Sequence, residues 1–281
     1  MTTQQKIALL AIASASILPL VDAMVKILVQ DYSVVMLAWI RMGLSATLLG
    51  SLAARKSGLG IFKPVAFRLQ VLRGCAAVLG TSLVFLGFRV MPLAECLAIV
   101  FLAPVLANLM SRYALNEPGS ALSWWLALLS FAGVLVIARP GGALFSWNAL
   151  FPLIGAFGLA LFLTLTRAVA ACDPPGTTAF FGPFIAFLVF SLALPFFWKA
   201  PSSRRDFAMF LAIGVLAAAA QYVQTIAFRM GTTHQVAPFG YLSLVFASLL
   251  GWAVFGDIPD VFSFVGMGMI VAAGLILVVR K

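Results

Sequence analysis

The chain has 281 residues, of which 63% are hydrophobic and only 9% charged, and its mean hydropathy is +1.12. A water-soluble protein with this balance would have a surface made mostly of hydrocarbon, so a sizeable soluble catalytic or nucleic-acid-binding domain is excluded. The net charge is +10, from 18 Lys and Arg residues against 8 Asp and Glu residues. In a membrane protein such an excess is typical of short cytoplasmic loops. We expect a multi-pass protein whose partners are the lipid bilayer and small molecules, with no nucleic acid.

Apolar segments follow one another along the chain, most of them close to the ~20 residues that cross a bilayer. They lie at residues 6–29, 33–54, 70–88, 91–113, 121–138, 147–171, 176–198, 206–229, 234–254 and 260–279. The breaks between them are short and contain turn residues, such as Asn116–Gly119 and Asp173–Gly176, so neighbouring segments are antiparallel. The pattern predicts an all-α polytopic membrane protein with ten transmembrane helices. Within it, Pro104 and Pro238 are expected to kink the fourth and ninth helices.

The basic residues between these segments predict which side faces the cytoplasm. With the N-terminus inside, one side collects Lys6, Arg55, Lys56, Lys63, Arg68, Arg73, Arg112, Arg167, Arg229, Arg280 and Lys281. The other side collects fewer, namely Arg89, Arg139, Lys199, Arg204 and Arg205. The bias places both termini in the cytoplasm, although the cluster at residues 199–205 argues locally for the opposite orientation.

The second half of the chain repeats the first. Positions of like type recur after 140 or 141 residues, as in Gly74 and Gly214, Glu117 and Asp257, Lys26 and Arg167, and Gly133 and Gly274. Residues 1–140 and 141–281 therefore share one five-helix plan, and because five is odd the two repeats insert in opposite orientations. Many secondary transporters are built this way, with substrate held between the repeats near the membrane midplane. A duplicated scaffold, a membrane-embedded enzyme or a channel are the alternatives.

Four charged residues in the apolar segments are candidates for gating or binding, because a charge inside the bilayer must face a cavity or a partner. Asp22 and Lys26 are four residues apart on one helix face, so they either pair with each other or serve the transport cycle. Arg41 is a candidate anchor for a substrate carboxylate, and its alternative is an ion pair with Asp22 or Glu95. Glu95 is expected near the outer side, where it meets a substrate ammonium group, changes protonation, or pairs at the interface.

A second group of candidates is uncharged. Gln221 and Gln224 share a helix face and carry donors and acceptors for a polar substrate, and the repeat places Thr81 opposite Gln221. The alternative for these side chains is hydrogen bonding between helices. Tyr222 and Tyr241 are expected to supply aromatic walls. His234, the single histidine, is either part of a proton-coupled gate or incidental.

Catalytic and metal-binding signatures are missing from the sequence. Cys75, Cys96 and Cys172 show no C-x-x-C spacing, and the chain has no H-E-x-x-H, G-x-S-x-G or Walker motif. We therefore expect no enzyme, no metal site and no cofactor. Any active transport would draw on gradients.

Several short motifs match a known pattern. They are Pro92-Leu93-Ala94-Glu95, Leu102-Ala103-Pro104-Val105, Leu115-Asn116-Glu117 and Gly133–Val136. In these motifs the chain resembles the EamA-type drug/metabolite transporter superfamily, and among its members it looks most like bacterial exporters of aromatic amino acids. The sequence departs from the family pattern at Asn116, where many members have Gly, and in the second half, where Thr232 and Gln235 replace the equivalents of Pro92 and Glu95.

The resemblance implies a bundle in which helices one to four and six to nine surround a central cavity, while helices five and ten lie at the periphery. It also implies export of small metabolites. We therefore expect an exporter of aromatic and other neutral amino acids that works by alternating access, as a monomer or a homodimer. Cargo of another class, such as a sugar, a nucleotide or a cofactor-like molecule, is the main alternative.

Overall fold

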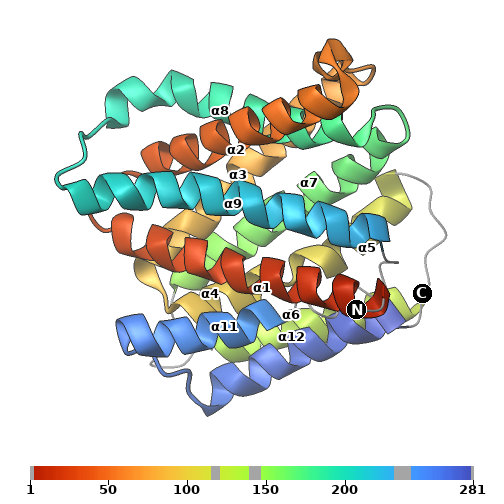
Figure 1. Ribbon diagram of the computed structural model, residues 1–281. Coiled ribbons are helices and arrows are strands. Elements are labelled where there is room, and N and C mark those ends of the chain that lie inside the picture. The colour runs from red at the N-terminus through yellow and green to blue at the C-terminus, as the bar shows by residue number, and fades with distance from the viewer. Residues whose placement is uncertain (1–2, 115–120, 139–146, 231–241, 280–281) are drawn as a thin grey trace.

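The computed structural model describes residues 3–114, 121–138, 147–230 and 242–279, and in these ranges it contains helices and no β-strand (Figure 1). The first half of the chain contributes α1 (Thr3–Leu28), α2 (Val34–Ser57), η1 (Leu59–Phe62), α3 (Phe67–Val90), α4 (Leu93–Val100), α5 (Ala103–Ala114) and α6 (Ala121–Ala138). The second half contributes η2 (Trp147–Ala149), α7 (Leu150–Ala170), α8 (Pro175–Phe197), α9 (Arg204–Met230), α11 (Leu242–Leu250), the π-helical turn η3 (Gly251–Phe255) and α12 (Val261–Val279). The predicted all-α class is confirmed.

Each of the ten predicted apolar segments contains helix in the described residues, but the segments differ in length. Seven helical stretches are long and apolar enough to cross a membrane. The remaining apolar helices, at residues 124–137, 242–255 and 261–273, are shorter. The number of crossings therefore stays a prediction, whereas the position of the helices follows the hydropathy pattern closely.

The fourth predicted segment is broken in the middle. α4 ends at Val100 and α5 begins at Ala103, and the N–H groups of Val105 and Leu106 both bond to the carbonyl of Leu102. Pro104 has no N–H to donate to the carbonyl of Val100, which removes one helical hydrogen bond at this point and favours a break. The predicted kink at Pro104 is confirmed, while Pro238 lies outside the described residues.

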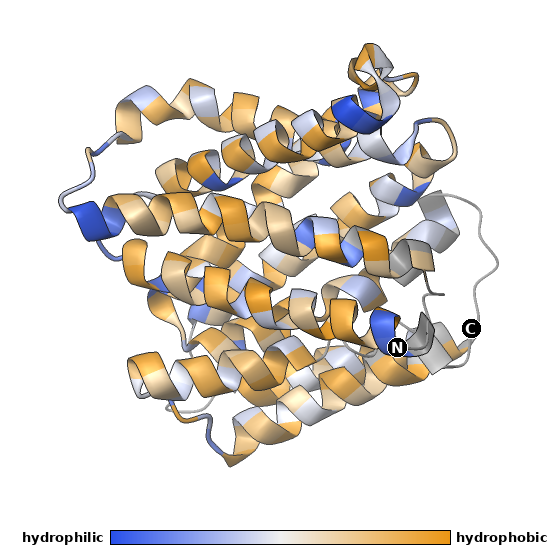
Figure 2. Cartoon of the chain, viewed as in Figure 1, coloured by the Kyte–Doolittle hydropathy of each residue, from blue (hydrophilic) through white to orange (hydrophobic). Residues whose placement is uncertain are grey.

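Hydrophobic residues cover the helices along their length, and hydrophilic residues gather toward their ends (Figure 2). The start of α1, the end of α2 and the end of α12 lie together at one end of the bundle, here called the N-terminal end (Figure 1). The end of α1 and the start of α9 lie at the opposite end, here called the far end.

Contacts between the two halves recur in equivalent places. α3 packs on α7 and α8, and α9 packs in the same way on α1 and α2. Gly74 of α3 lies so close to Ile185 that an added Cβ would overlap it, and Gly214 of α9 has the same relation to Leu44. Leu44 and Ile185 are 141 positions apart, so the same kind of helix contact occurs at equivalent positions of the two halves.

The turns that follow the first helix of each half also correspond. Asp173, between α7 and α8, accepts a hydrogen bond of 2.6 Å from the N–H of Val65 just before α3. Tyr32, between α1 and α2, donates one of 2.8 Å to Asp206 in the first turn of α9. Residues 32 and 173 are again 141 positions apart. Each turn holds the start of a helix from the other half, but with different side chains.

α6 and α12 cross at their glycines. A Cβ added to Gly133 would lie 2.7 Å from the carbonyl oxygen of Gly266, and a Cβ added to Gly266 would lie 2.6 Å from the carbonyl oxygen of Gly133. Backbone atoms cannot move aside as a flexible side chain can, so this crossing requires residues without a Cβ.

Gly266→Ala is therefore expected to lower stability, because overpacking costs about 1–3 kcal/mol. Gly268→Ala is the matched control: it lies two residues away in the same helix, where an added Cβ meets nothing within 4 Å. Thermal unfolding in detergent should show a lower Tm for Gly266→Ala and an unchanged or higher Tm for Gly268→Ala. Equal Tm values for the two variants would contradict the tight crossing.

Candidate functional site

A cavity of about 240 Å³ lies where helices of both halves meet. Its walls come from α1, α2, α3, α7, α8 and α9, through Leu18, Arg41, Met42, Ser45, Ala77, Phe162, Gly182, Pro183, Ala217, Gln221 and Gln224. Most of the described residues in this lining are apolar, and among them Arg41 carries a charge. This central cavity therefore combines an apolar wall with a few polar groups, which is the composition expected of a small-molecule site.

Arg41 reaches the central cavity from the middle of α2. Its Nη1 lies 3.5 Å from Oδ1 of Asp22 on α1, and its guanidinium lies 5.6 Å from the centre of the Phe85 ring. The side chains of Arg41 and Asp22 are 22% and 13% exposed. Of the two alternatives for Arg41, the ion pair with Asp22 is present in this structure, and the side chain also borders the cavity.

The predicted uncharged residues divide into two groups. Gln221 and Gln224 both line the central cavity, as their shared helix face predicted. Thr81 is buried in α3 and does not line it; Ala77, one turn earlier, does. Tyr241 and His234 lie outside the described residues.

Tyr222 does not face the central cavity, contrary to its predicted place in an aromatic wall. Its hydroxyl accepts a hydrogen bond of 2.8 Å from Lys56, whose ammonium also lies 5.1 Å from the centre of the ring. The two residues line a separate pocket of about 120 Å³ between α2, α8 and α9. Because Tyr222 follows Gln221 directly on α9, a turn of about 100° per residue carries it away from the cavity face.

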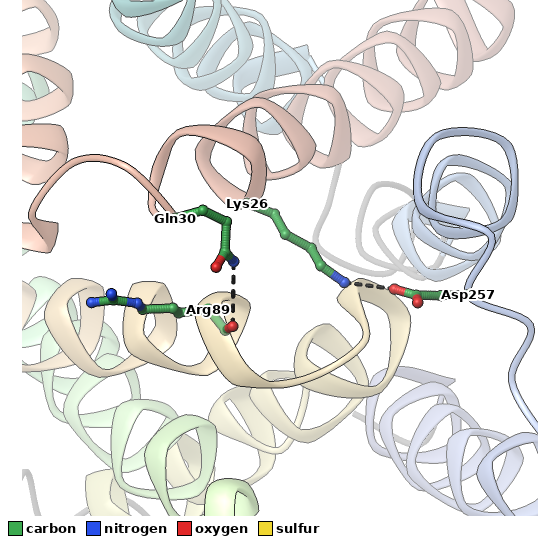
Figure 3. Close-up of polar contacts among 4 residues, drawn as sticks. All are labelled: Lys26, Gln30, Arg89 and Asp257. Atoms are coloured by element: carbon green, nitrogen blue, oxygen red, sulfur yellow. Dashed lines mark hydrogen bonds and ion pairs between the residues drawn. The ribbon is translucent and has the colours of Figure 1, made fainter.

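The far end of the bundle is closed by an ion pair between the two halves (Figure 3). Nζ of Lys26, near the end of α1, donates to Oδ2 of Asp257 over 2.6 Å and lies 4.5 Å from the centre of the Phe255 ring. Asp257 follows Gly256, whose φ of +71° is a left-handed conformation that favours glycine. The turn after η3 therefore directs the carboxylate of Asp257 back toward α1.

Two further contacts support this closure. Oγ of Ser263 on α12 donates to Oε1 of Glu95 on α4 over 2.6 Å. The side-chain amide of Gln30 donates to the carbonyl of Arg89 over 3.3 Å, next to the ion pair (Figure 3). Glu95 is thus bonded to the second half, and this structure favours the pairing alternative for it.

The expected pair between Asp22 and Lys26 is not formed. Both residues lie on one face of α1, as their spacing predicted, but Asp22 contacts Arg41 and Lys26 contacts Asp257. The spacing of two residues on a helix predicts that they share a face, but it does not predict which residue each of them contacts. Sequence reasoning did not name Asp257 as a candidate site residue. The recurrence of an acidic residue at Glu117 and Asp257, 140 positions apart, was a signal that could have identified it.

Arg73 is a second correction, because the charge pattern had placed it in a cytoplasmic loop. It lies inside α3 and is only 2% exposed. Its guanidinium donates to Thr166 Oγ1, to the carbonyl of Thr178 and to Gln70 Oε1 over 2.8–2.9 Å, and Gln70 in turn donates to Asp173. The i, i+3 spacing of Gln70 and Arg73 was the available signal for this buried network.

The lining of the central cavity shows to which end it extends. Gln224 lies in the part of α9 nearest the N-terminal end, and its side chain is exposed. Toward the far end, Leu28, Phe88 and Leu93 are almost fully buried. The structure therefore places polar groups of the cavity nearer the N-terminal end, while the Lys26–Asp257 pair joins the two halves at the far end.

Comparisons with known proteins agree with this architecture. A crystal structure with 18% identical residues aligns with a TM-score of 0.65 over 98% of this chain and 96% of its own, which shows a shared fold. Riboflavin transporter of Rhizobium johnstonii is 28% identical over 202 residues, covering 72% of this chain and 67% of its own length.

Two more relatives have other named substrates. Pseudopaline exporter CntI of Pseudomonas aeruginosa is 28% identical over 235 residues, covering 82% of this chain and 81% of its own. S-adenosylmethionine uptake transporter of Rickettsia bellii is 20% identical over 210 residues, covering 75% and 72%. These names do not support the expected placement among aromatic amino-acid exporters. The family model of EamA-like transporters matches residues 5–139 and again residues 146–280, and the chain therefore belongs to the EamA-like transporter family.

Proposed function

We propose that this chain is a secondary transporter that exports small metabolites by alternating access, with the central cavity as its binding site. The observation that carries this proposal is the convergence of Arg41, Gln221 and Gln224 on one cavity whose walls come from both halves of the chain. A site between two halves can be exposed to one side and then the other by a rocking motion. The closed far end and the exposed Gln224 correspond to one end state of such a cycle.

The proposed arrangement consists of two inverted five-helix repeats, residues 1–140 and 141–281, with ten crossings of the inner membrane and both termini in the cytoplasm. Two observations support it. The contacts Gly74–Ile185 and Gly214–Leu44 are equivalent under the repeat. The basic residues of the α2–α3 connection lie at the same end of the bundle as the start of α1, as the positive-inside rule requires.

The chemistry of the cavity favours a polar cargo with an apolar part. Arg41 carries five N–H donors, and two glutamine amides carry both donors and acceptors. A carboxylate on Arg41, an ammonium group near the amide oxygens and an apolar side chain against Phe162 would suit an amino acid. The relatives named above carry riboflavin, pseudopaline and S-adenosylmethionine, so a cofactor-like cargo is the second candidate.

Counterflow in proteoliposomes tests the transport proposal. Vesicles preloaded with amino acids, riboflavin or S-adenosylmethionine should take up the labelled compound saturably if it is cargo. Gln221→Ala should reduce the exchange about 10-fold or more, since losing one hydrogen bond to a charged group costs about 1.5–3 kcal/mol. Tyr222→Phe is the matched control, because it removes a hydroxyl on the neighbouring residue that faces away from the cavity.

Saturable exchange that survives Gln221→Ala and fails in Tyr222→Phe would move the binding site to the pocket between α2, α8 and α9. A sustained current that does not saturate would show a channel, and chemical alteration of the compound would show an enzyme.

Topology is tested separately with reporter fusions in a Gram-negative bacterium. Green fluorescent protein fused after Lys281 should fluoresce, and alkaline phosphatase at the same position should be inactive, because both termini are placed in the cytoplasm. Alkaline phosphatase inserted after Ser202, between α8 and α9, should be active. The reverse pattern at the two positions would show that the cluster Lys199, Arg204 and Arg205 determines the orientation.

A further inference from the structure

Four charged side chains lie in series between the central cavity and the far end. Arg41 borders the cavity and pairs with Asp22 over 3.5 Å; one turn further along α1, Lys26 pairs with Asp257 over 2.6 Å. The order of signs is positive, negative, positive, negative. Every neighbouring pair in this series is attractive, including the central pair of Asp22 and Lys26, which this structure leaves unformed.

The central pair is within reach. Residues four apart on a helix lie on the same face with their Cβ atoms about 5–6 Å apart, a spacing at which an acid and a base form an ion pair. Asp22 and Lys26 therefore need only side-chain rotation to meet, with no movement of α1. Forming this pair releases both outer partners, Arg41 on the cavity side and Asp257 at the far end.

The two existing pairs differ in tightness. The 3.5 Å between Arg41 and Asp22 exceeds the 2.7–2.9 Å typical of a charge-assisted N–H···O bond. A free carboxylate or phosphate in the cavity can approach Arg41 more closely than Asp22 does and can bind two N–H groups at once. Among the described residues that line the cavity, none is acidic and would repel such a group.

We propose that the cargo carries an anionic group which replaces Asp22 on Arg41, that Asp22 then pairs with Lys26, and that the release of Asp257 opens the far end. This inference rests on the proposed transport function and adds the class of cargo and the route by which cargo binding is coupled to opening. The four charges sum to zero before binding. The surplus negative charge brought by the cargo finally resides on Asp257, whose side chain is the most exposed of the four at 30%, so it is left facing water.

The exchange is tested without cargo by removing charges in the series. Spin labels on Asp31→Cys and Ile258→Cys, in a chain with its three native cysteines replaced by serine, lie at exposed positions on the two sides of the Lys26–Asp257 pair. Arg41→Gln frees Asp22 to pair with Lys26, so the distance between labels measured by pulsed electron paramagnetic resonance should lengthen by several ångströms. Adding Asp22→Asn to Arg41→Gln removes the competing partner and should restore the short distance.

This reversal distinguishes the exchange from simple loss of structure, because a second substitution in a damaged region would not repair it. Asp22→Asn alone should keep the short distance. A short distance in Arg41→Gln, or a long one in the double variant, would overturn the exchange while leaving the saturable counterflow of the wild-type protein, and hence the transport function, in place.

The class of cargo is tested with pairs of probes that differ in an anionic group. Counterflow of L-tryptophan is compared with that of tryptamine, and counterflow of flavin mononucleotide with that of riboflavin. Exchange of the anionic member alone, lost at least 10-fold in Arg41→Gln, is the expected result. Equal exchange of the probe that lacks the anionic group, or undiminished exchange in Arg41→Gln of the probe that has it, would overturn the assignment of an anionic cargo.

Discussion

The cost of an unpaired charge in hydrocarbon governs where the two halves of this protein meet. A charge at the centre of a bilayer costs about 2.5–3.5 kcal/mol on insertion scales, so each charged side chain within an apolar helix needs a partner or water. Lys26 pairs with Asp257, and Glu95 accepts a hydrogen bond from Ser263. Arg73 donates hydrogen bonds to Thr166 and to the carbonyl of Thr178. In each of these contacts the partner belongs to the other half of the chain. The few charges that the sequence tolerates inside the membrane thus hold the halves together.

Arg41 is the exception, because its partner Asp22 belongs to the same half. It is also the charged residue that borders the central cavity. A pair that does not join the halves can exchange its partner without separating them, whereas loss of the Lys26–Asp257 pair separates them at the far end. This difference supports the proposal that α2 recognises the cargo, while α1 and the turn before α12 hold the far end together.

The repeat is kept in the backbone more strictly than in its side chains. Gly74 and Gly214 pack in the same way on Ile185 and Leu44, since no other residue fits so close to a neighbouring helix. In the corresponding turns, by contrast, Asp173 bonds to backbone N–H groups and Tyr32 to a carboxylate. The positions equivalent to Gln70, Arg73 and Asp173 of the buried network at the N-terminal end are occupied by Phe210, Ile213 and Tyr32. The two ends are therefore held by different interactions, and they need not open with equal ease.

Hydropathy alone located the helices, because the length of an apolar segment and the turn residues around it are properties of the sequence itself. The helix face shared by Gln221 and Gln224 also followed from spacing, as did the break at Pro104. The contacts that the polar and charged side chains make with other helices did not follow from the sequence pattern. Asp22 and Lys26 were spaced for each other, yet each pairs with a charge from another element. Tyr222 contacts Lys56 because one residue along α9 turns the side chain by about 100°. Such pairings depend on how helices are placed side by side, which the local pattern does not contain.

Accessibility of the cavity from the two sides of the membrane tests alternating access most directly. Gln224 lines the central cavity and is exposed, and Gln224→Cys in a chain without native cysteines reports the accessibility of the cavity to a membrane-impermeant thiol reagent. We predict modification from the side of the N-terminal end when Lys26 and Asp257 are intact, and from the opposite side once Asp257→Asn weakens the closure. Modification from one side only, in both proteins, would contradict a site that is exposed to the two sides in turn.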